Sequence, residues 1–271
     1  MDSETDSSQP VDQLIVVGSS AGGVEALSVL VGSLPAGLPA SFVVAQHLDP
    51  SRPSHLGEIL GRRSIMPVIT VSDCENLLPG NIYIVPSNRH VEITDHEVRV
   101  HADATRRPTP SIDLLLATAA KMFGERLVAL ILTGSGSDGA AGAHAVKEAG
   151  GTVIIQDPAT AAFPSMPRAL ASPLVDATIP LDDIGAFLVS FLTQPAETES
   201  ETADDQLSTL LERLRDRRGI DFAAYKSPTI ERRLRRRMAV VGVDTLGDYL
   251  VHVDEHPDEE ERLVGSFLIK V

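Results

Sequence analysis

Apolar and polar positions follow two regular patterns up to about residue 193. Short apolar runs rich in β-branched residues alternate with stretches whose apolar residues recur every three or four positions. The runs predict strands and the stretches predict helices. Continuous apolar strands between helices are typical of a parallel sheet covered on both faces. The predicted strands, with their turns, lie at 14–20, 41–47, 127–139 and 151–157, and the predicted helices at 23–34, 111–123 and 139–150.

The segment 66–102 departs from this alternation. Its apolar runs are shorter and contain no helical periodicity, and turn-forming residues occur at "PGN" and "TDHE". The segment predicts a small insertion of short antiparallel strands. The predicted fold class is therefore α/β, a doubly wound and mainly parallel sheet with a small antiparallel insertion.

A change of pattern after residue 193 predicts a second, all-α domain. Residues 194–205 are rich in Pro, Glu, Thr and Ser without apolar periodicity, which is typical of a linker. Helical periodicity then returns and predicts four helices, one of them ending at Gly242. The predicted organisation is a disordered N-terminus at 1–10, an α/β domain at 11–193, a linker at 194–205 and a helical domain at 206–271.

Composition narrows the classes of function. The formal net charge is −15, which argues against a general nucleic-acid binder. No apolar run is long enough to span a bilayer, so no membrane insertion is expected, and the N-terminus lacks the features of a signal peptide. The single cysteine, Cys74, cannot form an internal disulfide, which favours a reducing, cytoplasmic location.

The glycine-rich turn "GSSAGG" follows the first predicted strand and precedes a helix. It fits G-x-S-x-G with Ser20 in the middle, an arrangement that exposes a serine oxygen at the edge of a sheet. A dinucleotide-binding turn would need a glycine at Ser20 and an acidic residue after the next strand, and a P-loop would need a following Gly-Lys. The turn therefore favours a nucleophilic serine over either nucleotide site, with a plain tight turn as the alternative.

Two further polar residues follow other predicted strands. His47 ends the strand after the serine's helix, and Asp138 follows the most apolar strand of the chain. Because parallel strands bring their carboxyl ends to one edge of a sheet, we expect these residues to lie beside Ser20. Histidine is a suitable general base and a carboxylate can orient it, which together predict a Ser-His-Asp hydrolase site without metal or cofactor.

The motifs as a group resemble the catalytic domain of chemotaxis receptor methylesterases. The resemblance covers 11–193 and rests on "VVGSSAGG", "VVAQHLDP", "IYIVPSNRHVEI", "RPTPSIDLLL", "LTGSGSDGAAG" and "QDPATAAFPSMPRAL". It implies hydrolysis of glutamate methyl esters on chemoreceptor helices, and deamidation of receptor glutamines. It also implies signalling kinase or receiver proteins as further partners. By motif, Ser20 is the nucleophile, His47 the base and Asp138 the acid.

Two departures from the family pattern concern the oxyanion site. Ala21 stands where the family often has threonine, and Ser135 where it often has methionine. Backbone N–H groups of Ala21 and Ser135 remain as the expected donors. The family's receiver domain is expected to be absent, because only about ten residues precede the first strand.

Residues 205–271 resemble the N-terminal helical domain of chemotaxis receptor methyltransferases. The chain ends near where the cofactor-binding domain of such an enzyme should begin, so we expect no methyl transfer. Within 227–242, one helical face is apolar and the other basic. The family resemblance implies that this basic face docks to acidic receptor helices. The docking residues predicted on this face are Arg232, Arg233, Arg235, Arg236 and Arg237. A solvated basic face without a partner is the alternative. For the whole chain, the alternative to an esterase is a catalytically weak scaffold or sensor.

Overall fold

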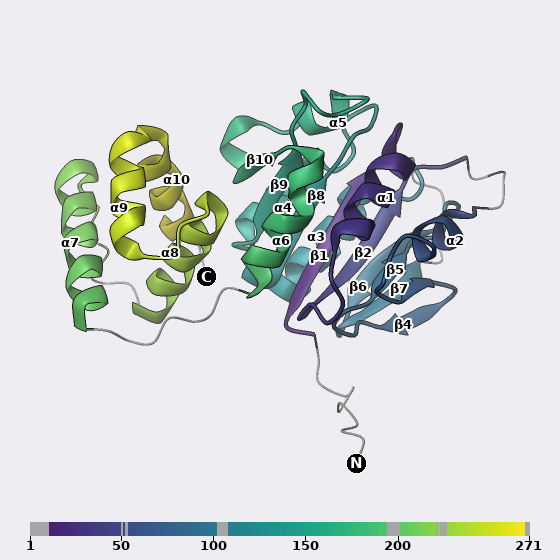
Figure 1. Ribbon diagram of the computed structural model, residues 1–271, viewed down its shortest axis with the longest axis horizontal. Coiled ribbons are helices and arrows are strands. Elements are labelled where there is room, and N and C mark those ends of the chain that lie inside the picture. Colours follow the sequence, from purple (N-terminus) through teal and green to yellow (C-terminus); the bar gives the residue numbers. More distant parts are fainter. Residues whose placement is uncertain are drawn as a thin grey trace, which may run out of the picture. The chain divides into compact units, whose positions relative to one another are not determined.

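The computed structural model describes residues 11–49, 51, 54–101, 108–193, 201–220, 222 and 227–268. The predicted disordered N-terminus at 1–10 lies outside the described residues. The chain divides into two compact units between Leu192 and Thr193, here called the α/β unit and the helical unit. Figure 1 labels their helices and strands.

The α/β unit is built on a parallel sheet. Among the described residues, seven strands form this sheet in the order β10-β9-β8-β1-β2-β5-β3. Every neighbouring pair is parallel. The strands are β1 (Gln13–Ser19), β2 (Ala40–Gln46), β3 (Val68–Thr70), β5 (Ile82–Ile84), β8 (Leu127–Ile131), β9 (Thr152–Gln156) and β10 (Ala177–Ile179).

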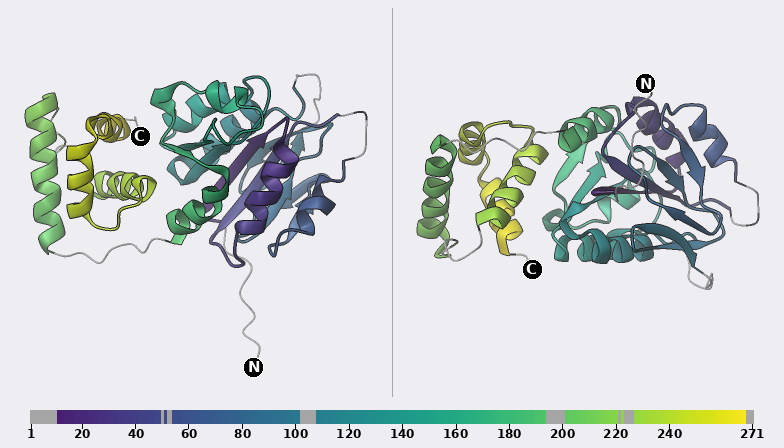
Figure 2. Two further views of the ribbon diagram at one scale, coloured as in Figure 1. Left: turned by 45° about the horizontal axis from the view of Figure 1, so that its top comes forward. Right: turned by 90° about the horizontal axis from the view of Figure 1, so that it is seen from below.

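Helices cover both faces of this sheet, as Figures 1 and 2 show. Along β1, Val16 packs into the core beneath α3 and α4, whereas Ile15 and Val17 pack into the core beneath α1, α2 and α6. Both faces are thus apolar, which explains the continuous apolar runs. The helices are α1 (Gly23–Ser33), α2 (Leu56–Gly61), α3 (Ile112–Phe123), α4 (Ala140–Glu148), α5 (Ser165–Arg168) and α6 (Ile184–Thr193), with 3₁₀ turns at Gly124–Arg126, Ser172–Leu174 and Leu181–Asp183.

The predicted antiparallel insertion is confirmed in part. The strands β4 (Cys74–Asn76), β7 (Glu97–His101) and β6 (His90–Thr94) form a small antiparallel sheet, with the β6–β7 turn inside "TDHE". The other two strands of the segment, β3 and β5, instead extend the main sheet in parallel. The reason is burial: every residue of β5 is buried, which requires a place inside the sheet rather than in a half-exposed hairpin.

The helical unit contains the four predicted helices. They are α7 (Glu201–Arg218), α8 (Ser227–Val241), α9 (Leu246–Glu255) and α10 (Pro257–Leu268). Gly242, with a positive φ of 76°, ends α8 as predicted. One boundary differs: α7 begins at Glu201, so residues 201–205 are helical rather than linker. The run ETADD carries acidic residues, a sequence pattern that is common at the start of helices. The rest of the predicted linker lies outside the described residues.

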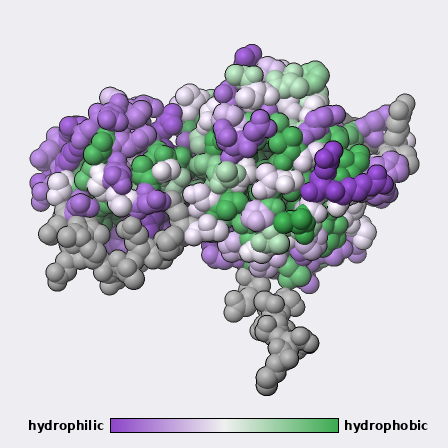
Figure 3. Space-filling view, in the orientation of Figure 1, coloured by the Kyte–Doolittle hydropathy of each residue, from purple (hydrophilic) through white to green (hydrophobic). Residues whose placement is uncertain are grey.

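The core of the helical unit is small. Ile230, Leu234 and Met238 on α8 lie in it, which confirms the predicted apolar face of that helix. Hydrophilic side chains cover much of the visible face of this unit in Figure 3. No helix among the described residues is long and apolar enough to cross a membrane.

Candidate active site

The three residues predicted to act together follow three adjacent strands. Ser20 follows β1, the central strand, which pairs with β2 on one side and β8 on the other. His47 follows β2, and Asp138 lies in the loop between β8 and α4. The strands that follow β1 in sequence are added first on its β2 side and later on its β8 side. Open α/β sheets bind ligands where the strand order reverses in this way, at the carboxyl ends of the strands.

His47 and Asp138 are in direct contact. Nε2 of His47 lies 2.9 Å from Oδ2 of Asp138, and the two side chains are 15% and 6% exposed. With Asp138 ionised, this geometry makes Nε2 the protonated ring nitrogen and leaves Nδ1 as the basic one. Nδ1 is the atom on which a proton from a nucleophile can be received.

Asp138 is held ionised by its hydrogen bonds. Burial would raise the pKa of its carboxyl, but the hydrogen bond from His47 and those from backbone N–H groups outweigh burial and hold the pKa below its ordinary value. The backbone donors are the N–H of Ile112, 2.8 Å from Oδ2, and the N–H of Asp113, 3.0 Å from Oδ1. Both belong to the first turn of α3, whose positive end also favours the anion.

Backbone bonds bring the Ser20 turn against its neighbours. The N–H of Ser20 donates to the carbonyl of Thr133 at 3.0 Å, and the N–H of His47 donates to the carbonyl of Ser19 at 3.0 Å. Ser20 itself is half-buried. The serine turn therefore lies directly between the residues that follow β2 and β8. A hydrogen bond between the Ser20 hydroxyl and Nδ1 of His47 stays a prediction.

The two expected oxyanion donors belong to the turns that follow β1 and β8. Ala21 follows it, and the carbonyl of Ala21 accepts a hydrogen bond from the Thr133 hydroxyl at 3.1 Å. Ser135 follows Gly134, where an added Cβ would lie 2.9 Å from the Ser20 Cβ and 2.0 Å from the Met166 sulfur. Only glycine therefore allows the β8 turn to approach the serine so closely. That the N–H groups of Ala21 and Ser135 bind an oxyanion stays a prediction.

Two polar residues at the site were not predicted from the sequence. Asp113 on α3 accepts hydrogen bonds from the N–H of Gly139 at 2.9 Å and of Gly142 at 2.7 Å. Gln46, the last residue of β2, bonds to both the Ser20 and the His47 turns. Both occur in the quoted motifs. Gln46 directly precedes His47, and that position was the available signal, whereas Asp113 stands beside no residue that was predicted to act.

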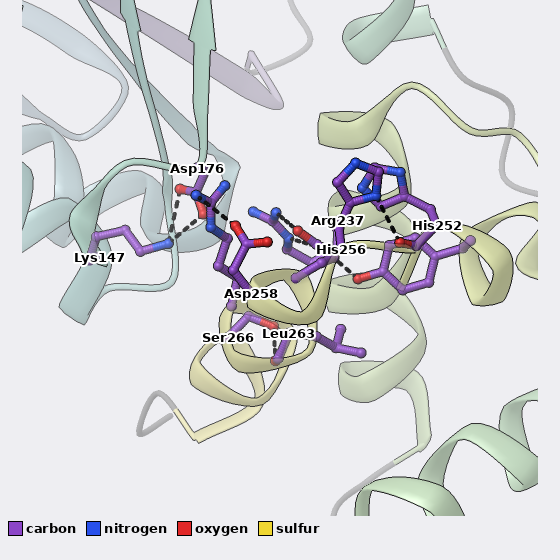
Figure 4. A network of polar contacts seen from close by, with 11 residues as sticks. Lys147, Asp176, Arg237, His252, His256, Asp258, Leu263 and Ser266 are labelled. Atoms are coloured by element: carbon purple, nitrogen blue, oxygen red, sulfur yellow. Dashed lines mark hydrogen bonds and ion pairs between the residues drawn. The ribbon is translucent and has the colours of Figure 1, made fainter. Parts of the chain in front are cut away.

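The basic face predicted on α8 is only partly exposed. Arg233 and Arg237 are 9% and 3% exposed, so the prediction that they dock a partner is wrong. Arg237 pairs with Glu259 through two hydrogen bonds, of 2.9 and 2.6 Å (Figure 4). Arg233 donates to the backbone carbonyls of Ser266 and Phe267. Each of these arginines holds α8 to α10, and the long side chain reaches partners that local periodicity does not reveal.

The other three arginines of that face differ in exposure. Arg232 and Arg235 are exposed and Arg236 is half-buried. Arg235 lies 4.0 Å from Glu231, one helical turn earlier. Exposed charges at the surface of α8 are therefore fewer than the sequence predicted. Within the described part of the chain, His, Cys, Asp and Glu form no group of three or more that could hold a metal ion.

Together the fold and this edge define an α/β protein of the doubly wound class with a serine, a histidine and an aspartate at its switch point. The sequence comparisons name its family. The family model described as CheB methylesterase matches residues 15–188, more than half of the chain, and the chain belongs to this family. A second model, the CheR methyltransferase all-alpha domain, matches residues 205–268. Both resemblances seen in the sequence are thereby confirmed.

Similar proteins of known structure and name support the same assignment. The crystal structure of the Thermotoga maritima CheB methylesterase catalytic domain superimposes with a TM-score of 0.61 at 33% identity, covering 65% of this chain and 97% of that one. The protein-glutamate methylesterase/protein-glutamine glutaminase of Moorella thermoacetica is 36% identical over 192 residues, 68% of this chain and 45% of that protein. The Escherichia coli K12 protein of the same name is 35% identical over 162 residues, 58% of this chain and 46% of that protein. The chain spans about half the length of the curated relatives it matches.

Proposed function

We propose that the α/β unit is a serine hydrolase that removes methyl esters from glutamate side chains of chemoreceptors. The observation that carries the proposal is the contact of His47 with a buried, ionised Asp138 at the strand end next to Ser20. The names of the relatives, protein-glutamate methylesterase/protein-glutamine glutaminase, supply the substrate class.

In the proposed mechanism, the Ser20 oxygen attacks the ester carbonyl while Nδ1 of His47 takes the hydroxyl proton. The N–H groups of Ala21 and Ser135 hold the oxyanion that forms. The intermediate collapses, the C–O bond to the methoxy group breaks, and His47 returns the proton so that methanol leaves. Asp138 stabilises the imidazolium during this exchange and fixes the ring tautomer.

The second half of the cycle restores the enzyme. A water molecule attacks the acyl-serine carbonyl, and His47 takes its proton and returns it to the Ser20 oxygen as the acyl bond breaks. The products are a glutamate carboxylate and free Ser20. The same steps applied to a receptor glutamine release ammonia and also give glutamate, so deamidation needs no further residue.

The helical unit is proposed to dock the receptor. Arg232 and Arg235 are exposed on α8 and would attract acidic methylation helices in the cytoplasm, with Arg236 beside them. Signalling kinase or receiver proteins are further proposed partners.

Mass spectrometry of a methylated receptor cytoplasmic fragment tests the substrate assignment. After incubation with the protein, peptides are expected to lose the methyl group at glutamate positions and to convert glutamine to glutamate. A protein that hydrolyses small esters but leaves every receptor peptide unchanged would refute the substrate class while keeping the hydrolase. A protein that binds the receptor without hydrolysing either substrate would support the scaffold alternative.

A further inference from the structure

The side chain of Gln46 connects the two turns that carry Ser20 and His47. Its amide nitrogen donates to the carbonyl of Ser20 at 2.7 Å and to the carbonyl of His47 at 2.8 Å. Its amide oxygen accepts a hydrogen bond from the Ser19 hydroxyl at 2.6 Å. Gln46 is 2% exposed, so both N–H donors and its oxygen are satisfied within the protein.

Neighbouring residues are shaped to this amide. Ser19 is fully buried, and its hydroxyl donates to Gln46. An added Cβ at Gly23 would lie 2.0 Å from the Gln46 amide oxygen, so only glycine leaves room for it. The two serines and the last glycine of "GSSAGG" therefore have separate roles: Ser20 carries the reactive hydroxyl, whereas Ser19 and Gly23 accommodate Gln46.

We propose that Gln46 is a positioning residue for the hydrolysis reaction, one that fixes the distance between the Ser20 turn and the His47 turn. The proposal rests on the proposed function. Gln46 touches the backbone of both reacting residues and neither reacting atom. It acts by holding the Ser20 hydroxyl and the His47 ring in a fixed relation, and a displacement of about 1 Å in such a relation costs about 100-fold in rate.

The two carbonyls differ in how much they depend on Gln46. The Ser20 carbonyl also accepts the N–H of Gly23 at 2.9 Å, so it keeps one partner when Gln46 is replaced. The His47 carbonyl would lose a buried donor, and an unsatisfied polar group moves toward water when it can. The expected consequence is a shift of the His47 turn away from Ser20.

The test compares Gln46→Leu and Ser19→Ala with a matched control, Ser41→Ala. Ser41 lies at the opposite end of β2, is fully buried, and donates to the Leu78 carbonyl at 2.6 Å. With p-nitrophenyl acetate as substrate, Gln46→Leu is expected to lower kcat about 10- to 100-fold with little change in KM. Ser19→Ala is expected to lower kcat several-fold. Ser41→Ala is expected to keep kcat within about twofold of the wild type, although its loss in Tm should be similar to that of Ser19→Ala.

A second measurement does not depend on activity. Nitrogen-15 NMR of the His47 ring is expected to show one tautomer, protonated at Nε2, in the wild type and a mixture in Gln46→Leu and Ser19→Ala. If the wild type hydrolyses no ester, the proposed function fails and the ring signals still decide the role of Gln46. Ring signals and kcat that are unchanged in Ser19→Ala and Gln46→Leu would overturn the proposal. So would an equal loss of kcat in Ser41→Ala. If Gln46→Leu does not fold, the comparison of Ser19→Ala with Ser41→Ala tests the positioning role of Gln46.

Discussion

The carboxylate of Asp138 accepts backbone N–H groups at the start of α3, where Asp113 lies, and the carboxylate of Asp113 accepts those at the start of α4, just after Asp138. Asp138 binds the N–H groups of Ile112 and Asp113 at the start of α3, and Asp113 binds those of Gly139 and Gly142 at the start of α4. The pair thus fixes both helices and the loop that presents Asp138 to His47. The pKa values of the two carboxyls are shifted in opposite directions. The pKa of Asp113 is raised, chiefly by burial, whereas the pKa of Asp138 is lowered because its hydrogen bonds outweigh burial.

The first prediction concerns stability at Asp113. Asp113→Asn keeps an oxygen for the N–H groups of Gly139 and Gly142 and removes a charge disfavoured by burial and by Asp138. Its free energy of unfolding at pH 7 is expected to equal or exceed that of the wild type. Asp113→Ala loses the acceptor, and is expected to cost about 0.5–2 kcal/mol, as loss of a helix cap does. Urea unfolding measures both.

The pH dependence of these variants follows from the raised pKa. A carboxyl whose folded pKa lies above its unfolded value, about 3.9, stabilises the protein at low pH and loses that contribution as the pH rises through the folded pKa. The advantage of Asp113→Asn over the wild type is therefore expected to be larger at pH 7 than near pH 4. A stability advantage of Asp113→Asn that shrinks as the pH rises would show that the pKa of Asp113 is not raised in the folded protein.

The second prediction concerns Asp138. Asp138→Asn keeps the size of the side chain, but an amide does not favour the Nε2–H tautomer of His47. The expected loss in kcat is on the order of 10⁴-fold, as for other triad aspartates. Because its pKa is lowered, Asp138 contributes stability above pH of about 3.9 that is lost as the pH falls through the folded pKa. The stability cost of Asp138→Asn should thus be largest at neutral pH. A kcat within tenfold of the wild type would remove Asp138 from the mechanism.

The third prediction concerns the buried pair of Arg237 and Glu259. Arg237→Ala leaves the Glu259 carboxylate, which also accepts the Tyr249 hydroxyl at 2.7 Å, without its cation. Removal of one partner from a buried pair costs about 3–5 kcal/mol. Arg235→Ala, on an exposed part of the same helix, is expected to stay within about 0.5 kcal/mol. Equal unfolding free energies for the two variants would contradict the buried role of Arg237.

The fourth prediction concerns receptor docking. Charge reversal of the exposed pair, Arg232→Glu with Arg235→Glu, is expected to raise KM for a methylated receptor fragment several-fold at low salt. The difference should fade at high salt, because exposed charges are screened. Turnover of p-nitrophenyl acetate should not change. An effect on the small ester as large as on the receptor would exclude a docking role.

The strand and helix pattern predicted most of the fold, because strands buried on both faces must be apolar throughout. The same reasoning placed Ser20, His47 and Asp138 at one edge, since position at a strand end is a local property of the sequence. The parallel pairing of β3 and β5 was missed, because runs of three residues carry no information about which neighbour they meet.

The remaining residues depend on contacts distant in sequence. Asp113 occupies an ordinary position in the first turn of a helix, and its importance arises from Gly139 and Gly142, which follow another strand. Arg237 has the same local pattern as exposed Arg235, yet it is buried because Glu259 lies opposite on α10. Local periodicity cannot distinguish the two arginines, whereas the packing of α8 against α10 does.

Methanol release from a methylated receptor fragment, measured for the wild type and for Ser20→Ala, tests the central claim most directly. Ser28→Ala is the matched control, since Ser28 lies on the helix that follows the same turn and its hydroxyl donates to the Val24 carbonyl of its own helix at 2.7 Å. The proposed mechanism predicts release by the wild type and by Ser28→Ala, and a loss of several orders of magnitude in folded Ser20→Ala. Methanol release by Ser20→Ala at the wild-type rate would contradict the assignment of Ser20 as the nucleophile.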